Sequence, residues 1–231
     1  INALIKKTGN ERFVYDAYRR LITMFGSIVM GVDRQKFERS LEEMKGKRGF
    51  RLDTELTADD LKILVEEFKR IYKKNTGEDF PTEPLEQLKK AVNAVFGSWF
   101  GDRAAKYRKL NEIPDNLGTA CNIQSMVFGN LGDNSGTGVG FTRDPSTGEK
   151  KFFAECLINA QGEDVVAGIR TPLRIEELKK RLPKAYKELD SIYKKLEKHY
   201  KDMLDIGFTV EEGKLYMLQT RVGKRTAASA L

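Results

Sequence analysis

The hydrophobic periodicity of the chain changes near Pro114, and this change constrains the fold more than any other feature of the sequence. Over residues 10–110, apolar residues recur every three or four positions, which is typical of amphipathic helices. The clearest stripe covers residues 61–72, and Thr57 with Asp60 is expected to cap its helix. After Pro114 the runs shorten to strand length. The sequence therefore predicts an α+β protein, in which a helical part precedes a sheet.

The same patterns predict the individual elements. Further helices are expected at residues 13–29, 85–99, 175–182 and 184–204, with loops at residues 46–53 and 76–84. Strands are expected at residues 119–128, 137–142, 152–158, 208–210 and 215–220. The helix over residues 184–204 has an apolar side that should cover one face of the sheet. We divide the chain into a helical subdomain, residues 1–112, and a sheet subdomain, residues 113–231.

Length and composition exclude several classes of protein. With 231 residues, of which 40% are hydrophobic, the chain is long enough for one domain or two subdomains. Its net charge of +7 is spread along helices that also carry acids, so we expect no nucleic-acid partner. No apolar run reaches the length of a membrane span, and we expect a cytoplasmic protein. Cys121 and Cys156 lie in apolar runs, which favours buried free thiols.

A glycine-rich segment, residues 129–145, follows the change in periodicity. It holds five glycines among hydroxyl and carboxylate side chains, between two apolar runs. Glycine tolerates a positive φ and lets main-chain N–H groups approach a phosphate without a Cβ in the way. A plain surface turn has the same composition, so the segment alone leaves both interpretations open.

Three blocks, at residues 129–145, 153–168 and 205–221, together resemble the nucleotide-binding region of the pyruvate, phosphate dikinase family. Phosphoenolpyruvate synthase is a more distant relative, and the resemblance covers essentially the whole chain. It implies an ATP-grasp-like fold, with an antiparallel sheet and covering helices, that binds ATP with Mg²⁺. The family interconverts ATP, phosphate and pyruvate with AMP, pyrophosphate and phosphoenolpyruvate, and passes the phosphoryl group through a histidine on a separate swivelling domain.

The final predicted hairpin, residues 205–221, carries the metal and phosphate residues that the resemblance implies. Asp205 and Gln219 match positions near the metals, and Arg221 matches a phosphate-contacting arginine, which makes it the catalytic candidate. A turn of odd length would place these side chains on one face, whereas a two-residue turn would separate them. From the residues alone, a solvated edge with Arg221 paired to a neighbouring acid is the favoured interpretation.

Other residues match the family's nucleotide site. Nucleotide contacts are expected from Gln124, Met126, Phe128, Gly136, Thr137, Gly138, Glu155, Glu163 and Asp164. The first three would lie on one face of a strand and form the wall of an adenine slot, although core packing explains the two apolar ones equally well. Glu163 and Asp164 suit ribose hydroxyls or an outer-sphere Mg²⁺, while loop capping by Asp164 stays open.

One position departs from the family pattern, because Gly207 stands where the family has a glutamate that is expected to ligate Mg²⁺. The change removes one oxygen ligand and one negative charge. We therefore expect weaker metal binding and poor phosphoryl transfer, with nucleotide affinity retained.

The resemblance also implies neighbouring parts of the same polypeptide. We expect a nucleotide-clamping subdomain before residue 1, and a phosphohistidine domain and a pyruvate-binding barrel after residue 231, in a parent enzyme that is a homodimer. The chain alone is then expected to be inactive. His199 lies on a charged helical stretch, and we assign it no function. The alternative is a non-catalytic nucleotide-binding or docking module, which Mg²⁺ dependence of ATP binding would distinguish from an enzymatic site.

Overall fold

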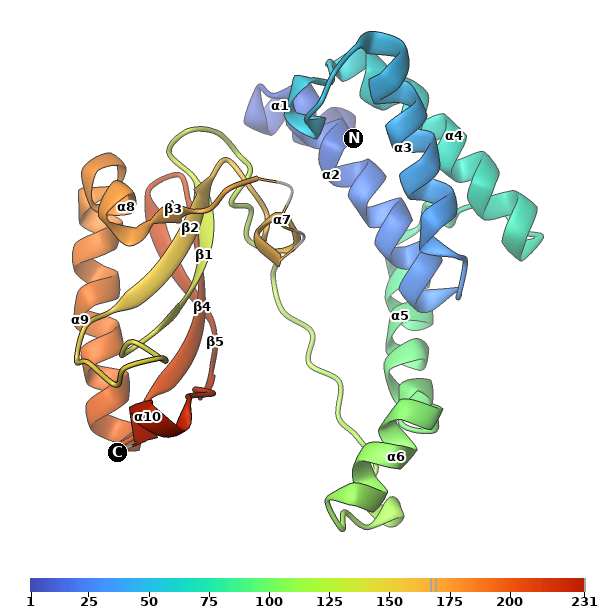
Figure 1. The fold of residues 1–231 in the computed structure, drawn as a ribbon. Helices are drawn as coiled ribbons and strands as arrows, with labels where there is room; N and C mark the ends of the chain where they lie inside the picture. Colours follow the sequence, from blue (N-terminus) through green and yellow to red (C-terminus); the bar gives the residue numbers. More distant parts are fainter. Residues whose placement is uncertain (167, 169, 231) are drawn as a thin grey trace. The chain divides into compact units, whose positions relative to one another are not determined.

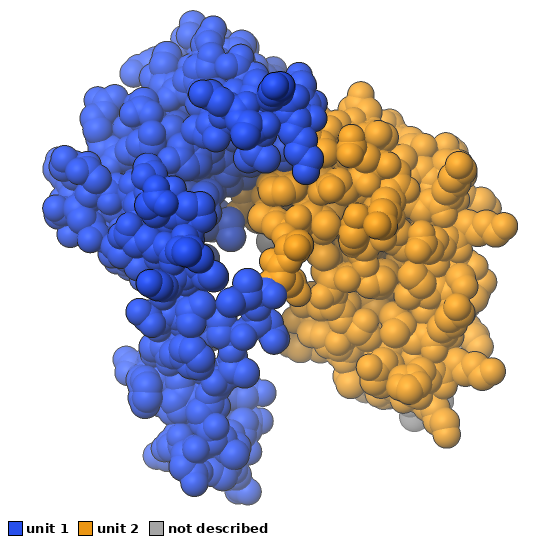
Figure 2. All heavy atoms as spheres, turned by 180° about the vertical axis from the view of Figure 1, so that it is seen from behind, with its two compact units in different colours: residues 1–123 blue, residues 124–231 orange. Residues whose placement is uncertain are grey.

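A computed structural model describes residues 1–166, 168 and 170–230 of the chain. The chain divides into two compact units, residues 1–123 and residues 124–231, which are coloured separately in Figure 2. Each unit is described by itself. The subdomain boundary expected at residues 112 and 113 falls just after the last α-helix of the first unit, and as a functional division it stays a prediction.

The first unit is helical, as predicted. Its α-helices are α1 (Asn2–Thr8), α2 (Glu11–Met24), α3 (Arg34–Arg48), α4 (Ala58–Thr76), α5 (Pro84–Ser98) and α6 (Asp102–Leu110). A π-helical turn, Phe25–Val29, extends α2, and short 3₁₀ turns lie at Asp53–Glu55 and Asp115–Leu117. The loop predicted from residue 46 begins later, because α3 continues to Arg48 and ends at Gly49, whose φ of 72° closes the helix in the left-handed region.

Local chemistry explains the best-predicted helix, α4. The Thr57 hydroxyl accepts the N–H of Asp60, while the Asp60 carboxylate accepts the N–H of Thr57, which forms a reciprocal capping box. The apolar side of α4 then packs into a core in which Tyr72, Phe68 and Phe37 are fully buried. Burial of these three rings stabilises this unit.

An ionic cluster is buried beside this core. Asp16 is 4% exposed and receives hydrogen bonds from Arg19, at 2.8 Å, and Arg20, at 3.1 Å. Burial alone would raise the pKa of Asp16, but the charges of Arg19, Arg20 and Arg12 outweigh it and hold the pKa below its usual value. The cluster therefore keeps Asp16 ionised in the folded protein.

In the second unit, the described residues form one antiparallel sheet of five strands in the order β3-β2-β1-β4-β5. The strands are β1 (Gly136–Phe141), β2 (Phe153–Ile158), β3 (Leu173–Arg174), β4 (Leu204–Glu211) and β5 (Lys214–Val222). The helices are α7 (Gly162–Val166), α8 (Ile175–Arg181), α9 (Pro183–Tyr200) and α10 (Ala227–Ala230). The predicted α+β, ATP-grasp-like arrangement of a sheet with covering helices is confirmed (Figure 1).

Helices α8 and α9 cover one face of this sheet, as Figure 1 shows. Leu178 and Leu189 from these helices join Ile206, Phe208 and other strand residues in one buried cluster. Helix α9 ends at Tyr200, earlier than the predicted residue 204, because Lys201 adopts a φ of 54° and terminates the helix.

The predicted strand at residues 119–128 is wrong. The segment pairs with no other strand in the described part of the chain, and a strand pattern without a ladder partner does not form sheet. Met126 is 59% exposed, and Cys121 is half-buried, so the expectation of a fully buried thiol holds only for Cys156. Every helix in the described ranges is too short or too polar to cross a bilayer.

Candidate functional site

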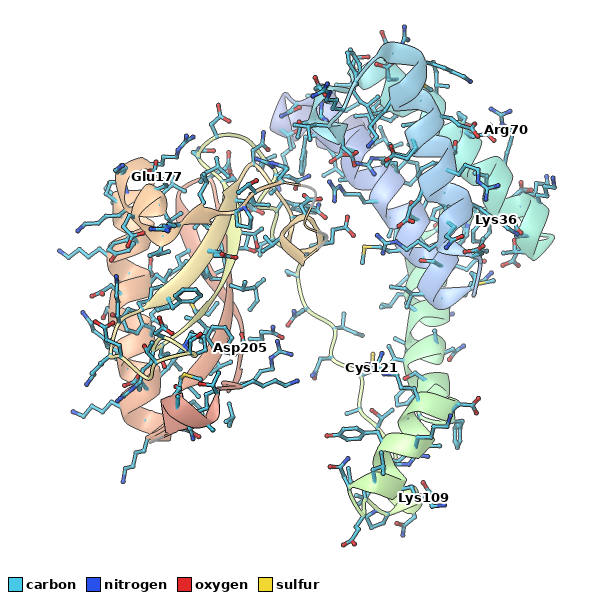
Figure 3. The ribbon with its side chains drawn as sticks, in the orientation of Figure 1. Lys36, Arg70, Lys109, Cys121, Glu177 and Asp205 are labelled. Carbon is cyan, nitrogen blue, oxygen red and sulfur yellow. The ribbon has the colours of Figure 1, made fainter. Side chains whose placement is uncertain are left out.

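The face of the sheet opposite α8 and α9 collects the polar residues that the final hairpin was expected to provide. On β4, Leu204, Ile206 and Phe208 point into the core, so the alternate residues, Asp205 and Gly207, lie on the opposite side (Asp205 is labelled in Figure 3). The register extends this side across the neighbouring strands. We call its uncovered part the open face and define it by Val139, Phe141, Phe153, Glu155, Asp205, Gly207, Gln219 and Arg221. Thr137 and Thr209 lie on the same side of the sheet but are buried.

A β-bulge puts the predicted residues together. The turn between β4 and β5 has two residues, Glu212 and Gly213, with φ values of 49° and 80° that suit a tight hairpin. Such a turn alone would have placed Arg221 and Asp205 on opposite faces. The register shifts by one residue between Gly207 and Phe208, which leaves Leu218 as the extra residue on β5. Asp205 therefore lies directly opposite Arg221.

Arg221 and Asp205 form an ion pair on this face. The Nε and Nη2 atoms of Arg221 donate to one oxygen of Asp205, at 3.1 and 2.8 Å. The Arg221 side chain is 62% exposed, so the pair contributes at most about 1 kcal/mol to stability. The pairing that the residues alone favoured is therefore present, and it orients the guanidinium while leaving its remaining N–H donors exposed.

A second row of residues runs across the whole sheet beside this pair. Its members, in strand order, are Arg174, Glu155, Val139, Gly207 and Gln219. Glu155 and Gln219 are exposed at either side of Val139 and Gly207. A Cβ at Gly207 would lie 3.3 Å from Cγ of Gln219, so a side chain there requires only a small movement of a flexible neighbour.

The oxygen donors on the open face suit a Mg²⁺ ion that is shared with phosphate groups. Asp205 offers a carboxylate and Gln219 an amide oxygen, and both are hard donors. The two residues lie on adjacent strands, since Gln219 pairs with the residue two positions after Asp205 on β4. No group of three His, Cys, Asp or Glu side chains in the described ranges could hold a metal by itself. Mg²⁺ commonly uses one or two protein carboxylates and completes its shell with phosphate and water.

The glycines of β1 face the other way. Gly138 lies on the helix-covered side, where a Cβ would come within 2.5 Å of the Phe208 ring and 2.6 Å of the Glu155 carbonyl oxygen. A Cβ at Gly136 would lie 2.7 Å from the carbonyl oxygen of Leu157. Close packing therefore accounts for glycine at both positions without a ligand. The hydroxyl of Thr137 is buried and bonds the carbonyl oxygen of Phe208 at 3.1 Å.

The carboxylates that follow β2 lie on α7, which packs against β1 and β2. The Asp164 carboxylate accepts the N–H of Gln161 at 2.8 Å, which is the loop-capping role that the sequence left open. Glu163 is half-buried on the same helix. The structure therefore places Glu163 and Asp164 on α7, and Glu155 on the exposed side of β2.

The three residues expected to line an adenine slot share no strand, which corrects that expectation. Gln124 and Met126 are exposed, and Phe128 is half-buried. The N–H of Phe128 donates to Glu211 at 2.6 Å, which fixes this segment to the end of β4. Glu211 was not predicted from the sequence, although it lies two residues after Thr209 and therefore on the same face of β4.

The chain is similar in sequence to one family of known proteins. The family model described as "Pyruvate phosphate dikinase, AMP/ATP-binding domain" matches residues 51–183 and 174–230. The chain is 57% identical over 232 residues to pyruvate, phosphate dikinase of Clostridium symbiosum, which covers 100% of this chain and 26% of that protein. It is 58% identical over 231 residues to the chloroplastic pyruvate, phosphate dikinase of Flaveria trinervia, and this alignment covers 100% of this chain and 24% of that protein.

The chain thus spans about a quarter of the length of these relatives. The match extends through the hairpin that carries Asp205, Gln219 and Arg221. The chain belongs to the pyruvate phosphate dikinase AMP/ATP-binding domain family.

Proposed function

We propose that this chain is the ATP-binding part of a pyruvate, phosphate dikinase and that the open face holds the phosphates of the nucleotide. The observation that carries the proposal is the bulge at Leu218, which brings Asp205, Gln219 and Arg221 onto one exposed face. The packing of the hairpin does not require Gln219 and Arg221 there, because both are exposed.

Each residue has a role that follows from its chemistry. Arg221, oriented by Asp205, donates its free N–H groups to phosphate oxygens. Asp205 and Gln219 would hold Mg²⁺ together with the phosphates. When bound, Mg²⁺ neutralises charge that develops on the phosphoryl oxygens during transfer. Gly207 supplies no carboxylate in this row, so we expect Mg²⁺ to be bound weakly and phosphoryl transfer to be poor.

The proposal extends to the reaction of the whole enzyme. The phosphoryl group would pass to a histidine on another domain of the same polypeptide, during interconversion of ATP, phosphate and pyruvate with AMP, pyrophosphate and phosphoenolpyruvate. A homodimeric parent enzyme is part of this proposal. We assign no acceptor role to His199, which lies on α9 with its ring edge-on to Tyr200, and we expect no turnover from the chain alone.

Calorimetric titration of the chain with ATP, in the presence and absence of Mg²⁺, tests this function. A nucleotide site on the open face predicts tighter binding with Mg²⁺ than without. Equal affinity in both conditions would point to the alternative, a non-catalytic nucleotide-binding module. No binding in either condition would leave a docking module as the better interpretation and would contradict the proposed function of this chain.

A further inference from the structure

A second polar site lies away from the open face, at the end of the second unit where β1 stops and β4 begins. A cavity of about 920 Å³ opens between the loop after β1, the last turns of α9 and the segment after β5. Its charged and hydroxyl lining is Thr142, Arg143, Thr147, Lys150, Tyr193, Lys194, Glu197, Lys198, Lys201, Asp202, Arg225 and Ser229. We call it the basic cavity.

Hydrogen bonds hold the loop after β1 against the segment after β5. The N–H of Thr226 donates to the carbonyl oxygen of Pro145 at 3.1 Å, and its hydroxyl donates to that of Ser146 at 2.9 Å. Gly148 has a φ of 79° and leaves no room for a Cβ, which would lie 2.9 Å from the carbonyl oxygen of Ser229. The cavity is therefore preformed, which lowers the entropic cost of binding.

Both carboxylates of the cavity are already neutralised by arginines. Arg143 donates two hydrogen bonds to one oxygen of Glu197, at 3.0 and 2.9 Å. Arg225 pairs with Asp202 at 2.9 Å. Within each pair the two charges cancel, and the pairing fixes the arginines against the wall. The charge of the cavity therefore comes from its lysines.

The lysines are left as a positive cluster. Among the described residues, Lys150, Lys198 and Lys201 form no ion pair, whereas Lys194 pairs with Asp190 outside the cavity. Lys198 and Lys201 lie at the C-terminal end of α9, where lysines also stabilise the helix dipole. That explanation does not apply to Lys150, which comes from the loop after β1.

We propose that the basic cavity binds a small anion that carries several phosphate groups. Three unpaired ammonium groups from two segments line the cavity, and with the hydroxyl of Thr147 they supply donors for phosphate oxygens. The volume lies in the range of small-molecule sites, which suits a compact multiply charged ligand. This site does not depend on the nucleotide site that the open face is proposed to form.

The test is calorimetric titration of the full chain with inorganic tripolyphosphate, without Mg²⁺. The decisive variant is the double substitution Lys150→Gln and Lys198→Gln, which removes two unpaired charges from the cavity. The matched control is Lys187→Gln with Lys195→Gln, which removes the same charge from exposed positions of α9 outside the cavity. Thermal unfolding of each variant checks that the fold is retained.

Loss of one charge-assisted hydrogen bond weakens binding about tenfold, so the cavity variant should bind at least about tenfold more weakly, while the control stays within about twofold. Arg221→Gln removes binding at the open face and should leave the difference between the cavity and control variants unchanged. Equal affinity of the cavity and control variants would overturn the proposal. A loss seen only with Arg221→Gln would also overturn it, since the anion would then occupy the open face alone.

Discussion

Gly207→Glu tests the part played by the centre of the open face. The new Cβ would meet Cγ of Gln219 at 3.3 Å, a contact that a flexible side chain relieves by moving a few tenths of an ångström. The new carboxylate would lie two residues from Asp205, or about 6.6 Å along the strand. Repulsion between two exposed carboxylates at that distance costs about 0.6 kcal/mol in water.

Removal of a glycine from a strand interior recovers about 0.5–1 kcal/mol, so we expect the free energy of unfolding to change by less than about 1 kcal/mol. Binding should change more. The added carboxylate supplies an oxygen and a charge to Mg²⁺, and we expect ATP with Mg²⁺ to bind about tenfold more tightly, which is about 1.4 kcal/mol. Metal-free ATP should bind no better than to the wild type, because the new charge repels its phosphates.

Calorimetric titration with and without Mg²⁺ measures both effects, and urea unfolding measures the stability. Gly207→Gln is the control, since it adds a side chain of the same shape without the charge. If the Glu and Gln variants bind ATP with Mg²⁺ equally well, the proposed role of charge at this position is refuted.

Three further predictions concern the fold and its thiols. Gly138→Ala should destabilise the second unit by about 1–3 kcal/mol in urea unfolding, because its Cβ would lie 2.5 Å from the Phe208 ring; unchanged stability would contradict the packing account. The pKa of Asp16 is lowered below 3.8 because its arginine neighbours outweigh burial, so the first unit should lose stability as the pH falls below about 4. Asp16→Asn should be less stable at neutral pH, but its free energy of unfolding should depend less on pH in this range. An equal dependence on pH in both proteins would argue against the cluster. Burial raises the pKa of Cys156 to about 11, so a thiol reagent at pH 8 should modify the half-buried Cys121 first and Cys156 only on unfolding. Mass spectrometry measures the order of modification, and modification of Cys156 before Cys121 would contradict the prediction.

Features encoded within a few residues were predictable from the sequence. The cap of α4 depends only on Thr57 and Asp60, three positions apart, and its apolar stripe spans the same helix. The two strands of the final hairpin and helix α9 were predicted in the same way, from local periodicity. In each case the residues that determine the structure also lie within it.

Features that depend on distant partners were not predictable. Residues 119–128 have the pattern of a strand, but the chain offers this segment no ladder partner within the described ranges. The bulge at Leu218 is visible only when β5 is paired with β4, so the sequence left the faces of Gln219 and Arg221 undecided. The glycines of β1 suggested a ligand, whereas a Cβ at Gly138 would meet the ring of Phe208, about 70 residues away in the chain.

The central claim is that the open face binds the phosphates of ATP, and Arg221→Gln tests it most directly. The Arg221 pair is exposed, so the variant should stay folded, with its stability changed by at most about 1 kcal/mol. Titration with ATP and Mg²⁺ should then give an affinity about 10- to 100-fold below that of the wild type, with an intermediate value for Arg221→Lys. A variant that binds ATP as tightly as the wild-type chain would contradict the claim, and the nucleotide site would have to lie elsewhere.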